Sequence, residues 1–276
     1  MPPTKLTVWT ADQFLPRWAR GFPTPLIDLA GVRSVDPFGA AVLILAARRC
    51  AEAGGRARVL LPQRQDVQLR LAGLGVFDLL GAEVWLDRLP PPPAGEGGWG
   101  RLVRVEEAGI SGLVDQVCQV LEERFPLGRR SINVLAMSMV ELLQNIPHHA
   151  NPLGEDVDPW GLAAVEEHSD HIHLVVADKG VGLRRSLDLN PHYRGLADPE
   201  VLEAVILQGA SRFTDPGRGG ALRRIREVVR ANEGRLFVRS GRAGLWQAEV
   251  EMDIGEVAAF PGVQVSIQLP RALFFG

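Results

Sequence analysis

The chain has 276 residues, of which 46% are hydrophobic, a length and composition that support two packed domains rather than a disordered chain. Its formal net charge is −3, with 30 basic and 33 acidic residues, so no overall basic field favours nucleic acid as a partner. The chain lacks an apolar run of about 18 residues, a signal-peptide pattern and cysteines at metal-ligand spacing, so we expect a soluble, cytoplasmic protein with reduced thiols.

The N-terminal part of the chain alternates short apolar runs with helical patterns. The apolar runs at 25–30, 57–61 and 82–86 predict strands. The pattern at 39–53 predicts a helix, and the pattern at 66–71 predicts the beginning of a further short helix. Strands that alternate with helices at these lengths are typical of an α/β layer.

A Pro- and Gly-rich segment, L-P-P-P-P-A-G-E-G-G-W-G at 89–100, interrupts these patterns. Four consecutive prolines followed by glycines exclude both a helix and a central strand. We therefore expect one domain at 1–89, a linker at 90–105 and a second domain at 106–276.

The stretches L-I-D-L-A-G-V-R-S-V-D-P-F-G-A-A-V-L at 26–43 and L-A-G-L-G-V-F-D-L-L-G at 71–81 resemble a STAS domain, the fold of anti-sigma-factor antagonists. In that family the Asp, here Asp36, is usually followed by two hydroxyl residues, the second of which accepts phosphate. Pro37 and Phe38 occupy those positions in this chain. The resemblance therefore implies a docking or dimerisation module that lacks the usual phosphoacceptor.

Beyond the linker, helical patterns and apolar runs predict a second α/β domain. A helix is expected at 111–124, and Ser131 is a plausible N-cap for another that ends near Pro147. A short helix is predicted at 200–207 inside a long polar segment, 184–216. Strands are predicted at 171–177, 235–239, 247–252 and 263–269.

Three motifs in this second domain carry chemistry. Glu141 and Asn145 lie one helical turn apart, so a carboxylate and an amide share one helix face. Asp178 ends an apolar strand and is followed by two glycines, in D-K-G-V-G. The run G-R-G-G-A-L at 217–222 is a Gly-rich turn that opens a helix, where free backbone amides favour phosphate.

In this order and at these separations the motifs resemble the N, G1 and G2 boxes of the GHKL family of ATP-binding domains. That family includes gyrase B, Hsp-type chaperones, MutL, sensor kinases and anti-sigma-factor kinases, and the chain is most similar to the last group. The resemblance implies an α/β sandwich with a mixed sheet (the GHKL or Bergerat fold) and binding of ATP with Mg²⁺.

The resemblance assigns a role to each residue of the boxes. Asn145 would coordinate Mg²⁺ and Glu141 would act as a general base. Asp178 would accept the adenine amino group, while Gly180 and Gly182 would let the backbone come close to the base.

The resemblance also implies that 184–216 is a lid over the nucleotide. Phosphate contacts would come from the following residues: His149, Arg212, Thr214, Gly217, Gly219 and Gly220. For His149, Arg212 and Thr214 an ordinary helix-end or surface role stays open. Ala221 stands where the family has its third Gly, a replacement that costs little if this residue is helical and is unfavourable if φ must be positive. Val263 stands where many relatives carry a Thr, so affinity is expected to be lowered.

The helix that follows the Gly-rich turn is amphipathic, with Arg223 and Arg224 on its outward, basic face. This face is expected to be solvated, or to lie beside the nucleotide or an acidic partner. All six histidines lie at or beyond His148, so no phosphoacceptor histidine precedes the ATP domain and a self-phosphorylating sensor kinase is disfavoured.

The resemblance therefore implies a regulator that binds Mg·ATP and either phosphorylates a Ser or Thr of a protein partner or changes its affinity with nucleotide state. A STAS-type antagonist or a sigma-factor-like protein is the expected partner, a homodimer is possible, and neither nucleic acid nor membrane is expected. Two alternatives stay open: an ATPase in which lid closure rearranges a dimer, and a binding module without enzymatic activity.

Overall fold

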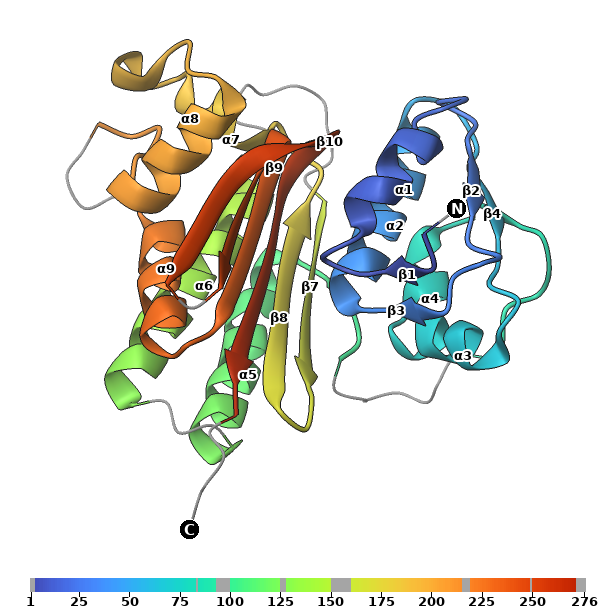
Figure 1. The fold of residues 1–276 in the computed structure, drawn as a ribbon, viewed down its shortest axis with the longest axis horizontal. Helices are drawn as coiled ribbons and strands as arrows, with labels where there is room; N and C mark the ends of the chain where they lie inside the picture. Colours follow the sequence, from blue (N-terminus) through green and yellow to red (C-terminus); the bar gives the residue numbers. More distant parts are fainter. Residues whose placement is uncertain are drawn as a thin grey trace. The chain divides into compact units, whose positions relative to one another are not determined.

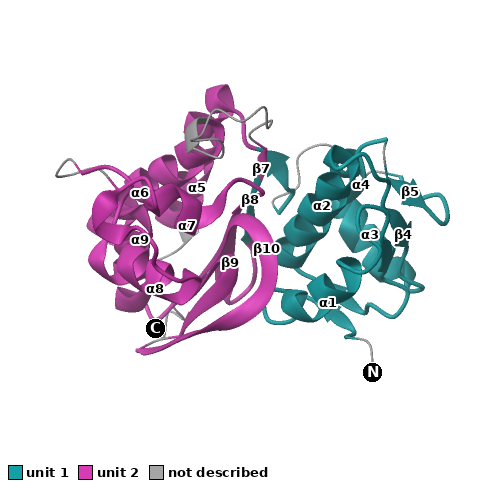
Figure 2. Cartoon of the chain, turned by 90° about the horizontal axis from the view of Figure 1, so that it is seen from above, with its two compact units in different colours: residues 1–104, 162–166 teal, residues 105–161, 167–276 magenta. Residues whose placement is uncertain are grey.

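The computed structural model describes residues 3–82, 84–92, 100–124, 128–149, 160–214, 219–248 and 250–271. The chain divides into two compact units, which Figure 2 shows in different colours. Unit 1 comprises Met1–Arg104 with Leu162–Glu166, and unit 2 comprises Val105–Gly161 with Glu167–Gly276. Part of the predicted linker, 93–99, lies outside the described residues.

Unit 1 contains two small sheets. In chain order its elements are β1 (Lys5–Leu6), α1 (Ala11–Trp18), β2 (Leu26–Asp28), β3 (Ser34–Val35), α2 (Pro37–Glu52), β4 (Arg58–Leu60), α3 (Gln65–Gly73), α4 (Val76–Leu80), β5 (Trp85–Leu86) and β6 (Val103–Arg104). Strands β2, β4 and β5 form a parallel sheet in that order, and β1 pairs in parallel with β3. Helices connect the parallel strands, so the predicted α/β layer is confirmed.

Helix α2 is the centre of unit 1 and is apolar on most sides, as expected of a buried helix. Asp36 is its N-cap: the Gly39 amide donates to Oδ1 at 2.7 Å and the Val8 amide donates to Oδ2 at 2.9 Å. Phe38, at the position of the family's phosphoacceptor, is completely buried. This loop is therefore packed into the core of unit 1.

Unit 2 is built around long strands and helices. Its elements are η1 (Glu107–Gly109), α5 (Ile110–Arg124), α6 (Arg129–His149), β7 (Gly161–Glu167, shared with unit 1), β8 (His171–Asp178), α7 (Gly182–Leu187), η2 (Pro191–Tyr193), α8 (Asp198–Glu203), η3 (Ala204–Gln208), α9 (Ala221–Ala231), β9 (Arg235–Ala248) and β10 (Glu251–Pro270). A five-stranded sheet has the order β6-β7-β8-β10-β9, and α5, α6 and α9 lie together on one face of its β8, β9 and β10 strands (Figure 1). None of the described helices is long and apolar enough to cross a membrane.

The predicted helix at 111–124 is confirmed as α5, and the α/β class holds for this unit as well. The second predicted helix corresponds to α6, but α6 begins at Arg129, so Ser131 lies inside it and is not its N-cap. Pro147 lies within the last turn of α6, which continues to His149. The predicted strands at 235–239 and 263–269 lie within β9 and β10. The prediction of a separate third strand at 247–252 is wrong, because β9 and β10 form one long antiparallel hairpin. The glycines of this hairpin suggest strand ends when only the sequence is considered. In the structure Gly244 lies within β9, and a Cβ at this position would lie only 2.8 Å from the indole of Trp246. The pairings β6–β7, β8–β10 and β9–β10 are all antiparallel.

The described part of the long polar segment, 184–214, contains several helical elements. It contains most of α7, the turn η2, α8 and a π-helical turn, η3. The helix predicted at 200–207 corresponds to α8 and η3 together, whereas α7 is not predicted from sequence.

Candidate functional site

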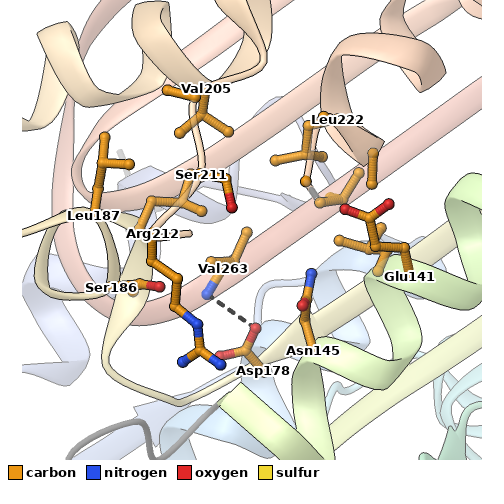
Figure 3. Close-up of a pocket in the computed structure, with 18 of the residues that line it drawn as sticks. Glu141, Asn145, Asp178, Ser186, Leu187, Val205, Ser211, Arg212, Leu222 and Val263 are labelled. Atoms are coloured by element: carbon orange, nitrogen blue, oxygen red, sulfur yellow. Dashed lines mark hydrogen bonds between the residues drawn. The ribbon is translucent and has the colours of Figure 1, made fainter. Parts of the chain in front are cut away.

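The three motifs meet at one cavity of about 740 Å³ in unit 2. Glu141 and Asn145 reach it from α6, Asp178 from the end of β8, and Gly219 and Gly220 from the turn before α9. Figure 3 shows Glu141 and Asn145 on the same side of one helix, with Asp178 close to Asn145. A cavity of this volume is sufficient for a nucleotide-sized ligand.

Asp178 is held by two backbone amides at one end of the cavity. The Gly180 amide donates to Oδ1 at 2.7 Å, and the Val263 amide donates to Oδ2 at 3.3 Å. Burial raises the pKa of the Asp178 carboxyl to about 6, and these two hydrogen bonds only partly oppose that effect. The carboxylate still has lone pairs that face the cavity, so it can accept a hydrogen bond from a ligand.

The backbone beside Asp178 is unusually close to β10. A Cβ on Gly262, which has φ +78°, would lie 2.1 Å from the Asp178 carbonyl oxygen, so only glycine fits. Gly182 has φ +77°, and a Cβ there would lie 2.9 Å from Ser240 Oγ. The requirement for glycine at 182 agrees with the sequence motif, and Gly262 is an additional glycine of the site.

Two polar side chains brace this region from the sheet. Ser240 Oγ accepts from the Leu183 amide at 2.9 Å and donates to the Gly262 carbonyl at 3.0 Å. The Gln264 side-chain amide donates to the Asp178 and Pro261 carbonyls at 2.7 and 2.8 Å. Sequence reasoning missed both side chains; the isolated Gly262 within a strand pattern was the one available signal that another backbone lies close by.

The α6 motif has one partner that the sequence does not predict. Glu141 forms an ion pair with Arg224 of α9, which lies 83 residues away in the chain. Asn145 lines the cavity and is half-buried. Its amide oxygen is a hard ligand of the kind that Mg²⁺ binds together with phosphate oxygens, so the donor set here fits that ion.

The Gly-rich turn opens helix α9 toward the cavity. Gly219 and Gly220 have φ +88° and +82°, and a Cβ on Gly219 would lie 2.5 Å from Ser211 Cβ. Ala221 is the first residue of α9, after Gly220 as N-cap, and needs no positive φ. The replacement of the family's third Gly therefore fits without strain, and the α9 N-terminus offers backbone amides to an anion.

The remaining predicted phosphate contacts are distributed differently. Arg212 lines the cavity, and in Figure 3 its side chain extends toward Asp178. Burial lowers the pKa of its guanidinium, which lies 4.6 Å from the centre of the Phe213 ring. Thr214 is exposed, and the cavity lining does not include it. Gly217 and the side chain of His149 lie outside the described residues.

No family model and no curated protein sequence matches this chain. Among solved structures, the chain is similar to the catalytic domain of the histidine kinase ThkA, with a TM-score of 0.29 and 14% sequence identity. The match covers 62% of this chain and 98% of the kinase domain. We therefore infer function from the residues of the cavity.

Proposed function

We propose that unit 2 binds Mg·ATP in this cavity and that the chain is a nucleotide-dependent regulator of a protein partner. The observation that carries the proposal is that a buried carboxylate, a carboxylate–amide pair and a Gly-rich helix N-terminus line a single cavity. These are the three elements that the GHKL resemblance assigns to base, metal and phosphate.

The adenine end of the proposed site is at Asp178. Its carboxylate would accept the adenine amino group, and the apolar side chains of Val176, Val263 and Val265 line the cavity nearby. Asn145 would bind Mg²⁺, and the amides at the start of α9 would bind the phosphates. Bound Mg²⁺ would neutralise phosphate charge.

In the proposed kinase reaction, Glu141 would accept the proton of a Ser or Thr hydroxyl on the partner. The hydroxyl oxygen bonds to the γ-phosphorus, the bond to the bridging oxygen breaks, and ADP leaves. A STAS-type antagonist or a sigma-factor-like protein is the partner we propose, with a homodimer as a further possibility. Cys50 and Cys118 are free thiols, which agrees with the cytoplasmic location that we propose.

Two other functions use the same cavity. An ATPase would pass the γ-phosphoryl group to water, with lid movement as its output. A binding module without enzymatic activity would retain the cavity without nucleotide. The strain-free fit of Ala221 at the start of α9 removes one reason for the second alternative.

Calorimetric titration of Mg·ATP into wild type and Asn145→Ala tests the proposal. We expect wild type to bind, removal of Mg²⁺ by EDTA to weaken that binding, and Asn145→Ala to weaken it by about tenfold or more. The absence of binding by folded wild-type protein would contradict the proposal. With γ-labelled ATP, label on a candidate partner that is lost in Glu141→Gln would distinguish a kinase from an ATPase.

A further inference from the structure

Arg224 connects three parts of the proposed phosphate end. From the first turn of α9 its Nε donates to Ser138 Oγ at 3.2 Å, and its Nη1 donates to the Gly219 carbonyl at 2.9 Å. Its Nη2 forms the ion pair with Glu141. Ser138 is completely buried in α6, so the guanidinium is anchored on two sides while its third side meets the carboxylate.

The Glu141 contact is the one that a ligand can replace. The side chains of Arg224 and Glu141 are 37% and 32% exposed, so the ion pair is accessible from outside the protein core. Arg224 Nη1 also lies beside Gly220, because a Cβ there would be 3.2 Å from it. The cation is therefore placed next to the turn that would hold the phosphates, and a phosphate group binds a guanidinium as a carboxylate does.

We propose that Arg224 makes the cavity selective for nucleoside triphosphates over diphosphates. In the nucleotide-free protein Nη2 of Arg224 is paired with Glu141; when Mg·ATP binds, the terminal phosphate takes the place of the Glu141 carboxylate at Nη2. ADP lacks that phosphate and leaves the ion pair in place. This inference rests on the proposed function, because it concerns the same cavity.

The exchange couples binding of the terminal phosphate to the release of Glu141, the proposed general base. A carboxylate oxygen that is occupied by the Arg224 guanidinium cannot at the same time accept a hydrogen bond along that direction from the hydroxyl group of a partner. Release of Glu141 by the terminal phosphate would make this group available only when a transferable phosphoryl group is present. The contacts of Arg224 to Ser138 and Gly219 would hold the guanidinium in place during the exchange.

The test is a calorimetric titration of Mg·ADP and of a Mg-bound ATP analogue with a non-hydrolysable β–γ bridge. Arg224→Gln is expected to weaken binding of the triphosphate by about tenfold or more and to leave ADP affinity unchanged. Glu141→Gln is expected to strengthen binding of the triphosphate severalfold, because it frees Arg224, again without an effect on ADP.

Arg223→Gln is the matched control. Arg223 lies next to Arg224 on the same helix and pairs with Glu227 at 3.0 Å on the exposed face, so this variant makes the same charge change away from the cavity. It is expected to keep the wild-type ratio of triphosphate to diphosphate affinity. A change of that ratio in Arg223→Gln as large as in Arg224→Gln would overturn the inference, since the effect would then be one of general charge.

An equal loss of both nucleotides in Arg224→Gln would also overturn the inference, because Arg224 would then only support the fold of the turn. If Arg224→Gln does not fold, as judged by thermal unfolding, Glu141→Gln decides alone: an unchanged affinity ratio overturns the inference and a raised ratio supports it. Wild type that binds neither nucleotide would overturn the proposed function and this inference together. Wild type that binds both, with an unchanged ratio in both variants, would overturn this inference alone.

Discussion

Two aspartates, one in each unit, have almost the same local chemistry and different surroundings. Asp36 follows β3 and Asp178 ends β8; each carboxylate accepts two backbone amides, and burial raises the pKa of each to about 6. Both hydrogen bonds of Asp36 are short, at 2.9 and 2.7 Å, whereas the Val263 bond of Asp178 is 3.3 Å. Asp178 also lines a cavity, while Asp36 is followed by the buried Phe38.

The difference teaches that a perturbed carboxyl group is not by itself a functional site. At Asp36 the cost of burial is offset by the cap of a central helix and by the Val8 amide, so this group serves the fold of unit 1. At Asp178 the same cost leaves a carboxylate with acceptor capacity that faces an open cavity, so this group is available to a ligand. The surroundings of the carboxylate, a packed core at Asp36 and an open cavity at Asp178, therefore decide its role.

The largest expected effect is the loss of stability caused by a substitution in the packed core next to Asp36. Phe38→Ser replaces a completely buried aromatic side chain with a small hydroxyl residue. We expect the unfolding free energy of unit 1 to fall by roughly 3–5 kcal/mol, measured by urea denaturation. A loss below about 1 kcal/mol would mean that this loop is open rather than part of the core.

Removal of the cap itself has the next largest effect. Asp36→Ala leaves the Gly39 and Val8 amides without their acceptor, and we expect a loss of roughly 2–3 kcal/mol in the unfolding free energy. Asp36→Asn should lose less, because Asn is also a good N-cap. Neither variant should change the affinity of the protein for Mg·ATP, and a fall in affinity would contradict a purely structural role for Asp36.

The pH dependence of ATP binding tests the proposed role of Asp178. The pKa of Asp178 is about 6 in the folded protein, against a usual value of 3.8 for Asp. Protonation of Asp178 therefore stabilises the folded state at low pH, and this contribution to the folding free energy is lost as the pH rises from 3.8 to about 6. ATP binding has the opposite sign, because an ionised carboxylate is a stronger acceptor for the adenine amino group than a protonated carboxyl.

We therefore expect affinity for Mg·ATP to fall by up to about tenfold per pH unit below pH 6 and to be flat above it, measured calorimetrically. Asp178→Asn should lack this dependence. The same fall in Asp178→Asn would assign the titration to a different group.

The smallest expected effect concerns Ala221. Because this residue is already helical, Ala221→Gly should lower the unfolding free energy by only about 0.5–1 kcal/mol and should leave ATP affinity unchanged. A clear gain in ATP affinity would show that the alanine impairs the Gly-rich turn.

The local parts of the site are predictable from sequence, because helix and strand periodicity place nearby residues. The spacing of Glu141 and Asn145 puts both on the cavity side of α6, and Asp178 follows a strand as expected. In contrast, Arg224 meets Glu141 across 83 residues, and periodicity only places Arg224 on an outward face. Such a contact depends on how α6 and α9 pack, which no local pattern determines.

The strands of the sheets are also only partly predictable from sequence. The apolar runs predict the strands at 58–60 and 171–178. They do not predict the full length of β9 and β10, because the backbone hydrogen bonds between these two strands extend both of them through glycines and polar residues. The hydrogen bonds of Ser240 to the Gly262 carbonyl and of Gln264 to the Asp178 carbonyl depend on this hairpin, so the sequence does not predict them either.

The measurement that tests the central claim most directly compares ATP with inosine triphosphate, which carries an oxygen in place of the adenine amino group. If Asp178 accepts that amino group, wild type should bind Mg·ATP about tenfold or more tightly than Mg·inosine triphosphate, and Asp178→Asn should bind the two within about threefold of each other. Asp36→Asn should discriminate as wild type does. Equal binding of both nucleotides by wild type, or undiminished discrimination in Asp178→Asn, would contradict the account.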